Sequence, residues 1–465
     1  MGNKSTREIR EKIEQFKEDS EKKEIDWILH NQDEVYEQML ILSRYFSLQK
    51  LQLSFIDPNI GDITPLRDAI QGSEIFDVLK IQAQNTKVND SNIIPSHITT
   101  LTRFHLDLSN TQITDVSNVI QVLNQNIQLE SIYLNFNKTH ITSIKLFDVH
   151  LFTQLKSLTL FAGHTQLNNI EQFTLNISKL QHLEELHLDF AGTQVTDLAP
   201  LGSGIRKLSK LLQLTIKLDD LQMENLFDLM QGISFCTNLC HLTLTFNNTN
   251  LNNIDQLGDL LKQLQNLEYL NIQFSNTKVT QADNLFQKIG YLTALKSLSL
   301  NFKDTSISSL TLHRILNSIQ KLEHLRISAN QNFDQSVLDA IPQQAQMKSL
   351  ILDLNDTNLN SVNKLMDQIG DLKLMRFLQI LISKTQVEEL NCSNLSKLQN
   401  LRTLQIDISQ TPMQKIIGLE EELGKIKFLN QFIFDAMDTK FHNNEYLERI
   451  KQELKKLQYL KEFHL

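Results

Sequence analysis

Apolar and polar positions recur along the chain with a period of about 28 residues. One stretch begins at Leu183 and reads Leu-Glu-Glu-Leu-His-Leu-Asp-Phe, and stretches with the same pattern begin at Leu239, Leu267 and Leu295. From Leu48 onwards, successive starts are 25 to 31 residues apart and most often 28. Self-similarity at such a period is typical of a solenoid, in which neighbouring repeats bury a core that one repeat could not bury alone.

Each repeat predicts a strand, a turn and a helix. Its first eight residues alternate between apolar and polar side chains, which indicates a strand with one buried face. Apolar residues three and four apart follow, such as Leu285, Ile289 and Leu292, which indicate an amphipathic helix. Because every strand is followed by a helix that returns the chain, we expect parallel strands. Counting from the first apolar residue, positions 4, 6 and 8 should enter the core, and positions 3, 5 and 7 should face the open side.

The Leu-x-x-Leu-x-Leu start at this period resembles the leucine-rich repeats of the ribonuclease-inhibitor-like class. The resemblance covers residues 48–465, as fifteen full repeats and a partial sixteenth. It implies an α/β solenoid, a right-handed horseshoe with a parallel β-sheet on the concave face and helices on the convex face. The residue pattern of the repeats also looks like that of leucine-rich repeat proteins of ciliates.

Position 11 departs from the commonest form of the family, because it holds Thr where Asn or Cys is usual. Thr139, Thr249 and Thr385 are examples of this column. A Thr hydroxyl can donate and accept hydrogen bonds to backbone groups of a turn. We therefore interpret the Thr column as a structural ladder.

The two ends of the chain differ from the repeats between them. Residues 1–47 do not fit the pattern, and their charged, Gly- and Pro-free stretch over residues 6–45 predicts one or two helices that cap the first repeat. The first six residues match the motif for N-myristoylation at Gly2. One myristoyl chain binds bilayers with an affinity of only about 10⁴ M⁻¹, so we expect weak membrane association. Residues 443–458 predict a helix, and residues 460–465 the start of a strand.

Composition argues against catalysis and against several ligands. The 465 residues include only 13 Gly, and no Gly-rich phosphate-binding motif or hydrolase motif occurs. The three cysteines do not form a disulfide framework, and Cys236 and Cys240 have no second ligand pair for a metal. A net charge of −9 argues against broad nucleic-acid binding. We expect no enzyme activity, cofactor, metal or small-molecule substrate, and a cytoplasmic location, with the periphery of a membrane or a cilium as alternatives.

The predicted concave face is the part of the chain best suited to contact a partner. Binding energy at such faces concentrates on aromatic and Arg side chains. The candidates at positions 3, 5 and 7 are Tyr133, Phe161, His187, Tyr269, Arg326 and Phe377. The sequence thus predicts a non-catalytic scaffold or adaptor that binds a protein. Two alternatives stay open, a structural part of a cytoskeletal or ciliary assembly and a GTPase-regulating factor of the leucine-rich repeat type.

Overall fold

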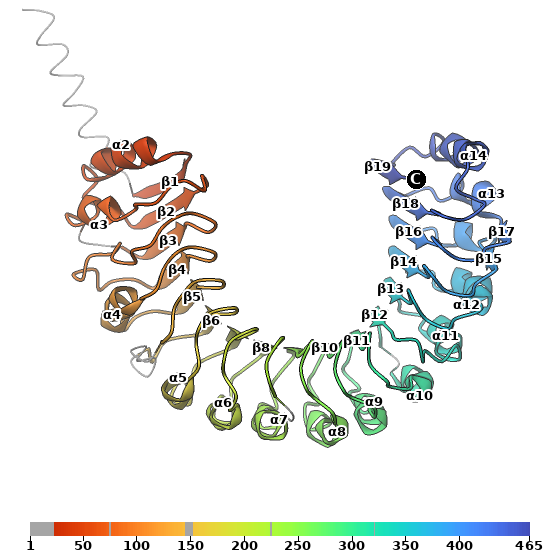
Figure 1. Ribbon diagram of the computed structural model, residues 1–465, viewed down its shortest axis with the longest axis horizontal. Helices are drawn as coiled ribbons and strands as arrows, with labels where there is room; N and C mark the ends of the chain where they lie inside the picture. The colour runs from red at the N-terminus through yellow and green to blue at the C-terminus, as the bar shows by residue number, and fades with distance from the viewer. Residues whose placement is uncertain (1–22, 74–75, 145–151, 224–225, 320) are drawn as a thin grey trace, which may run out of the picture. The chain divides into compact units, whose positions relative to one another are not determined.

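The chain folds into two compact units, each built from strand–turn–helix repeats. The computed structural model in Figure 1 describes residues 23–73, 76–144, 152–223, 226–319 and 321–465. Residues 1–222 and 231–236 form the first unit, and residues 223–230 and 237–465 form the second. Within those described ranges, no helix combines the length and the apolar character that crossing a bilayer requires.

The first unit contains a parallel sheet in which consecutive strands are neighbours. Its strands are β1 (Glu24–Leu29), β2 (Lys50–Phe55), β3 (Val78–Gln82), β4 (Arg103–Asp107), β5 (Ser131–Asn135), β6 (Ser157–Phe161), β7 (Glu185–Asp189) and β8 (Gln213–Lys217). Its helices are α2 (Gln32–Leu42), α3 (Pro65–Ala69), α4 (Ser117–Gln125), α5 (Glu171–Ile177) and α6 (Ala199–Ile205). The residues of α7 (Phe227–Ser234) are divided between the two units.

The second unit repeats this arrangement with a second run of parallel strands. Its strands are β9 (His241–Thr245), β10 (Tyr269–Gln273), β11 (Ser297–Asn301), β12 (His324–Ser328), β13 (Ser349–Asp353), β14 (Phe377–Leu381), β16 (Thr403–Asp407), β18 (Gln431–Asp435) and β19 (Glu462–His464). Its helices are α8 (Asp255–Leu261), α9 (Asp283–Ile289), α10 (Leu310–Ser318), α11 (Val337–Ala340), α12 (Asn363–Gln368), α13 (Leu419–Leu423) and α14 (Asn444–Leu454). The short strands β15 (Glu389–Asn391) and β17 (Lys415–Ile417) pair separately from the main strands.

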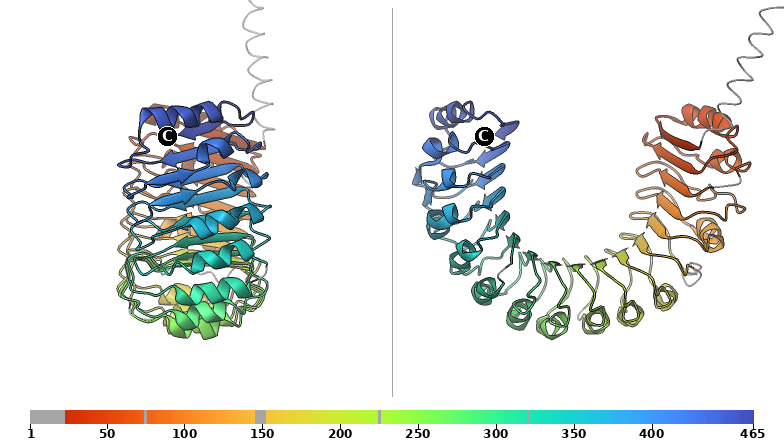
Figure 2. Two further views of the ribbon diagram at one scale, coloured as in Figure 1. Left: turned by 90° about the vertical axis from the view of Figure 1, so that its right-hand side faces the viewer. Right: turned by 180° about the vertical axis from the view of Figure 1, so that it is seen from behind.

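In both units the helices cover one face of the sheet and leave the other face bare (Figures 1 and 2). We call the bare face the inner face. The predicted register is confirmed, because Tyr269 of β10 pairs with His241 of β9 and with Ser297 of β11, each one 28-residue repeat away. Leu298 and Phe302, at positions 4 and 8 of their repeat, are buried as expected. The helices are shorter than the sequence predicts, since α9 ends at Ile289 and Leu292 lies in the turn that leads to the next strand.

The Thr column forms the predicted structural ladder. In each case the hydroxyl donates to the carbonyl oxygen three residues earlier, with oxygen–oxygen distances of 2.7 Å for Thr139, 2.8 Å for Thr249 and 2.7 Å for Thr385. The residue before the Thr adopts a left-handed backbone, with φ of 59° at Lys138 and 56° at Lys384. The strands that are followed by this Thr therefore end in the same turn, which fixes where the side chains at positions 7 and 9 leave the sheet.

The N-terminal segment differs from our expectation of a helical cap over residues 1–47. Glu24–Leu29 form β1, which pairs in parallel with β2, so this part of the prediction is wrong. Ile25 and Leu29 are buried in register with Leu51 and Phe55, and the repeats thus begin one strand earlier than the sequence pattern indicated. Within this segment α2 is helical, and residues 1–22, including Gly2, lie outside the described residues.

Candidate functional site

All six predicted contact residues lie on the inner face. Tyr133 (β5), Phe161 (β6) and His187 (β7) belong to the first unit, and Tyr269 (β10), Arg326 (β12) and Phe377 (β14) to the second. Arg326 is exposed and the other five are half-buried. The structure therefore places these side chains where a partner could reach them, but it divides them into separate groups.

The first group is a stack of rings across β4, β5 and β6, which we call the aromatic stack: His105, Tyr133 and Phe161. His105 pairs with Tyr133 in the strand register, and their rings lie parallel with centroids 4.0 Å apart. The Phe161 ring meets Tyr133 edge-on at 5.8 Å. His105 was not among the predicted contact residues, although its place at position 5, one repeat before Tyr133, is visible in the sequence.

Polar side chains at the carboxyl ends of the strands hold the aromatic stack in place. Lys217 Nζ lies 5.5 Å from the centroid of the Phe161 ring and 4.0 Å from Asp189 Oδ2. Asn137 donates to the same Asp189 oxygen at 3.1 Å and accepts a hydrogen bond from the Gly163 backbone at 2.6 Å. The rings thus form a fixed surface with an apolar face, and the polar side chains beside it are hydrogen-bonded or ion-paired with one another. Such a surface is suited to packing against a partner.

Burial shifts the protonation of this stack. Burial, with the nearby Lys80 ammonium adding to it, lowers the pKa of His105 to about 4. Burial also raises the pKa of the Tyr133 hydroxyl and lowers the pKa of His187. Within the described residues nothing hydrogen-bonds to Nε2 of His105. The ring of His105 is therefore neutral at pH 7 and stacks on Tyr133 as an aromatic group.

The depressed pKa of His105 predicts a loss of stability in acid. The unfolded chain takes up the proton near pH 6.5 and the folded chain only near pH 4. Between these values the unfolded state binds more protons, so stability falls as the pH falls. We expect His105→Gln to lose less stability than the wild type when denaturant unfolding is compared at about pH 7 and about pH 5. His324→Gln, on the exposed inner face of β12, is the control; an unchanged pH dependence in His105→Gln would contradict this account.

The predicted residues of the second unit do not form one cluster. Tyr269 packs against His241 with centroids 5.8 Å apart. Arg326 pairs in register with Ser299 and Ile351, and Phe377 with Ser349 and Thr403. Because β11, β12 and β13 separate Tyr269 from Phe377, these two anchors do not act on one contact point.

Charged side chains of the second unit gather in two rows that the sequence analysis did not single out. The basic row lies just before β13, β14 and β16, at position 2: Lys348, Arg376 and Arg402. The acidic row lies at position 7, at the carboxyl ends of β16 and β18: Asp407 and Asp435. The repeat numbering could have found both rows, but only if every position had been compared across repeats.

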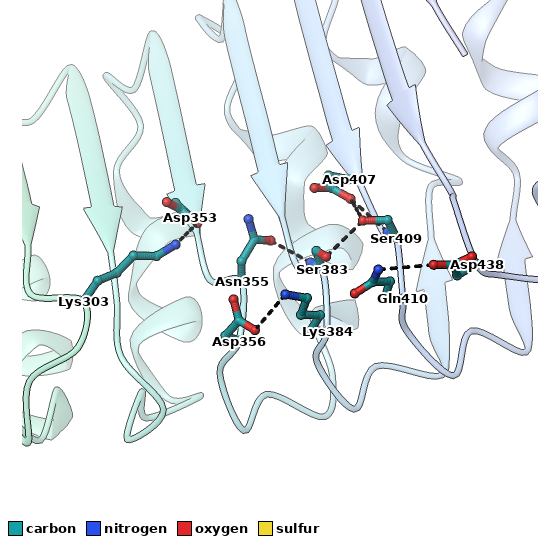
Figure 3. Close-up of polar contacts among 10 residues, drawn as sticks. All are labelled: Lys303, Asp353, Asn355, Asp356, Ser383, Lys384, Asp407, Ser409, Gln410 and Asp438. Carbon is teal, nitrogen blue, oxygen red and sulfur yellow. Dashed lines mark hydrogen bonds and ion pairs between the residues drawn. The ribbon is translucent and has the colours of Figure 1, made fainter.

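Contacts along the carboxyl ends of the second unit's strands form a polar edge that includes Asp407 of the acidic row (Figure 3). Lys303 pairs with Asp353 at 2.8 Å, which reaches across β12. Ser409 Oγ donates to Asp407 at 2.7 Å, and its backbone N–H donates to the same oxygen at 2.9 Å. The Asp407 carboxylate is therefore held in a fixed orientation by a backbone donor and a hydroxyl donor.

The cysteines and acidic groups of the described residues offer little reactive chemistry. Burial raises the pKa of the Cys236 thiol to about 12, and burial also raises the pKa of Cys392. Cys236 donates to the Ile205 carbonyl inside the first unit, whereas Cys240 is partly exposed at the start of β9. Across the described ranges, no three His, Cys, Asp or Glu side chains converge as metal ligands would.

Comparisons with known proteins support the fold. No protein-family model matches the sequence, and no curated protein matches it. A leucine-rich repeat protein of Leptospira interrogans is 16% identical, with 94% of this chain and 89% of that chain covered and a TM-score of 0.52. The functional domain of InlJ from Listeria monocytogenes is 16% identical, with 80% of this chain and 70% of that chain covered and a TM-score of 0.46. The chain has the leucine-rich repeat fold, as its sequence predicts.

Proposed function

We propose that this leucine-rich repeat chain is a non-catalytic scaffold that binds a protein partner through the inner face of its sheet. The observation that carries the proposal is the aromatic stack, because His105, Tyr133 and Phe161 are half-buried, held rigid and open on one side. Rigid aromatic side chains lose little conformational entropy on binding and commonly dominate the energy of protein interfaces. The stack therefore has the properties of a binding anchor.

Two finer parts of the proposal rest on the sequence alone. N-myristoylation at Gly2 would tether the scaffold weakly to a membrane, since one acyl chain gives only marginal binding. We also propose a cytoplasmic location, because three cysteines in 465 residues are too few for a disulfide framework. A role in a cytoskeletal or ciliary assembly and a role in GTPase regulation stay predictions.

The double variant Tyr133→Ala, Phe161→Ala tests the proposal. We expect it to lose capture of the partner by at least tenfold, as the removal of a hot spot does. The control is Tyr291→Ala, whose side chain is 54% exposed just after α9 on the helical side. Capture is measured with the full chain as bait, and a thermal melt confirms that each variant is folded. Equal capture by the double variant, or a loss in Tyr291→Ala alone, would move the site away from the inner face.

A further inference from the structure

Two of the three cations in the basic row of the second unit have no ion-pair partner among the described residues. The backbone N–H of Arg376 bonds to the Lys348 carbonyl at 2.8 Å, and that of Arg402 bonds to the Arg376 carbonyl at 2.8 Å. The three cations thus start neighbouring strands, about 4.8 Å apart. Lys348 pairs with Glu323 at 2.5 Å, whereas Arg376 and Arg402 are exposed and have no ion pair among the described residues. Like charges on neighbouring strands destabilise a sheet, so an anionic partner would relieve a cost of folding.

The acidic row lies at the carboxyl ends of β16 and its neighbour β18, so it shares only β16 with the basic row. Asp407 and Asp435 are direct neighbours in the strand register. Their carboxylates accept hydrogen bonds from neutral groups, the Ser409 and Met437 backbone and the Ser409 hydroxyl. Neither carboxylate has a cation partner among the described residues. The inner face therefore has positive charge before β14 and β16 and negative charge at the carboxyl ends of β16 and β18, and the two rows overlap at β16.

Apolar side chains lie on the inner face between the two rows. They are half-buried and come from three strands: Ile351 of β13, Phe377 and Leu381 of β14, and Ile433 of β18. Between β14 and β18, β16 carries the polar side chains of Thr403 and Gln405 at positions 3 and 5. Residues at position 2 border this face, since in the first unit side chains at positions 2 and 3 together line a cavity of about 460 Å³. A partner that covers the apolar strip therefore comes within reach of both rows.

The spacing of the rows fits one kind of secondary structure. From position 2 to position 7 is five residues, or about 16 Å along a strand. An α-helix with its side chains is about 10–12 Å wide, which is less than this distance, so contact with both rows also needs the length of the Arg376 and Arg402 side chains. From β13 to β18 the strands span about 15 Å, which corresponds to about ten helical residues, or nearly three turns.

We propose that the inner face of β13–β18 binds an amphipathic helix of a protein partner, with an acidic flank against Arg376 and Arg402 and a basic flank against Asp407 and Asp435. The apolar stripe of this helix covers Phe377 and its apolar neighbours. This inference rests on the proposed function and names the chemistry of the partner at the second unit.

The probe is a synthetic helical peptide of about 14 residues with a Leu stripe, Glu on one flank and Lys on the other. Matched peptides carry the same stripe with Glu on both flanks or Lys on both. Binding to the full chain is measured by fluorescence anisotropy at low salt, where charge contributes most. We expect the mixed peptide to bind at least tenfold more tightly than either control. Equal binding of the three peptides, or no binding, would overturn the proposal.

Charge reversal in the chain locates the binding. We expect Arg376→Glu, Arg402→Glu to weaken binding of the mixed peptide at least tenfold. Adding Asp407→Lys and Asp435→Lys should restore it, because the helix then binds in the opposite direction. Arg67→Glu, Arg314→Glu is the matched control, since it makes the same charge change at two exposed arginines on helices α3 and α10. Unaltered binding in the first double variant, or no recovery in a four-site variant that melts normally, would refute the assignment.

Three further outcomes separate this inference from its rivals. If vesicles containing phosphatidylserine bind the wild type and not the Arg376→Glu, Arg402→Glu variant, the basic row serves a lipid surface and the helix proposal falls. If the peptides fail while partner capture still depends on Tyr133 and Phe161, the proposed function stands and this inference alone is wrong. If the mixed peptide binds as expected while capture ignores Tyr133 and Phe161, the inner face of the second unit is the site.

Discussion

Replacing Phe302 by Ala is expected to lower the free energy of unfolding by about 3–5 kcal/mol. Phe302 is fully buried at position 8, where its ring lies 6.3 Å from that of Phe274 and 6.0 Å from that of Phe286. Truncation removes the contacts with both rings and leaves a cavity, because the next strand offers only Ala329 at the same position. The change is measured as a shift of the denaturant midpoint.

Phe227→Ala is the control for Phe302→Ala, because this phenylalanine is 40% exposed at the start of α7. We expect it to lower the free energy of unfolding by less than about 1 kcal/mol. This is at most about a third of the effect expected for Phe302→Ala. Hydrogen exchange adds a local measurement, since a repeat array transmits destabilisation mainly to neighbouring repeats. Faster exchange throughout the chain, with no maximum at β10 to β12, would show that Phe302 is not part of a local stack.

The second large effect is expected at Asn126, where Asn126→Ala should cost about 3 kcal/mol because it leaves buried backbone groups without partners. The Asn126 side chain is fully buried at the end of α4. Its oxygen accepts from the Leu101 N–H at 2.8 Å, and its amide group donates to the carbonyls of Ile98 and Val122, each at 2.8 Å. The described residues between β3 and β4 contain no helix, so this side chain supplies hydrogen bonds that a helical turn would otherwise supply.

Two further substitutions serve as comparisons for the stability change of Asn126→Ala. Gln121→Ala, at an exposed site on the same helix, should change stability by less than about 0.5 kcal/mol. Asn126→Asp keeps the acceptor for Leu101 but loses the amide donors, and buries a charge if it ionises, so it should also destabilise. Denaturant unfolding of the three variants gives the comparison. A cost for Asn126→Ala no greater than that for Gln121→Ala would mean that the hydrogen bonds of Asn126 are not needed.

Sequence reasoning succeeded where apolar burial alone sets the structure. The 28-residue spacing placed Leu270, Leu298 and their equivalents in one register, and the structure pairs these residues. A one-residue slip would turn every buried side chain outward, so the register is strongly specified. The Thr ladder could also be predicted, because the turn and the hydroxyl recur together at one position.

The same reasoning failed at the N-terminal boundary. Glu24–Leu29 lack the Leu-x-x-Leu-x-Leu spacing, and the apolar run Trp27, Ile28 and Leu29 is equally compatible with a helix. What makes this segment a strand is the edge of β2, which supplies backbone partners along its whole length. That edge exists only once the following repeats have folded, so no local pattern records it.

The sequence by itself determined the repeat, its parallel strands, its buried positions and the side chains that face away from the core. Only the tertiary structure decided which of those side chains meet. His105 stacks on Tyr133 because β4 and β5 pair in that register and burial keeps the ring neutral. Arg376 and Arg402 become a row because pairing sets residues 26 positions apart beside each other. The repeat follows from burial, which acts on every residue separately, whereas a binding surface depends on contacts between strands far apart in the sequence.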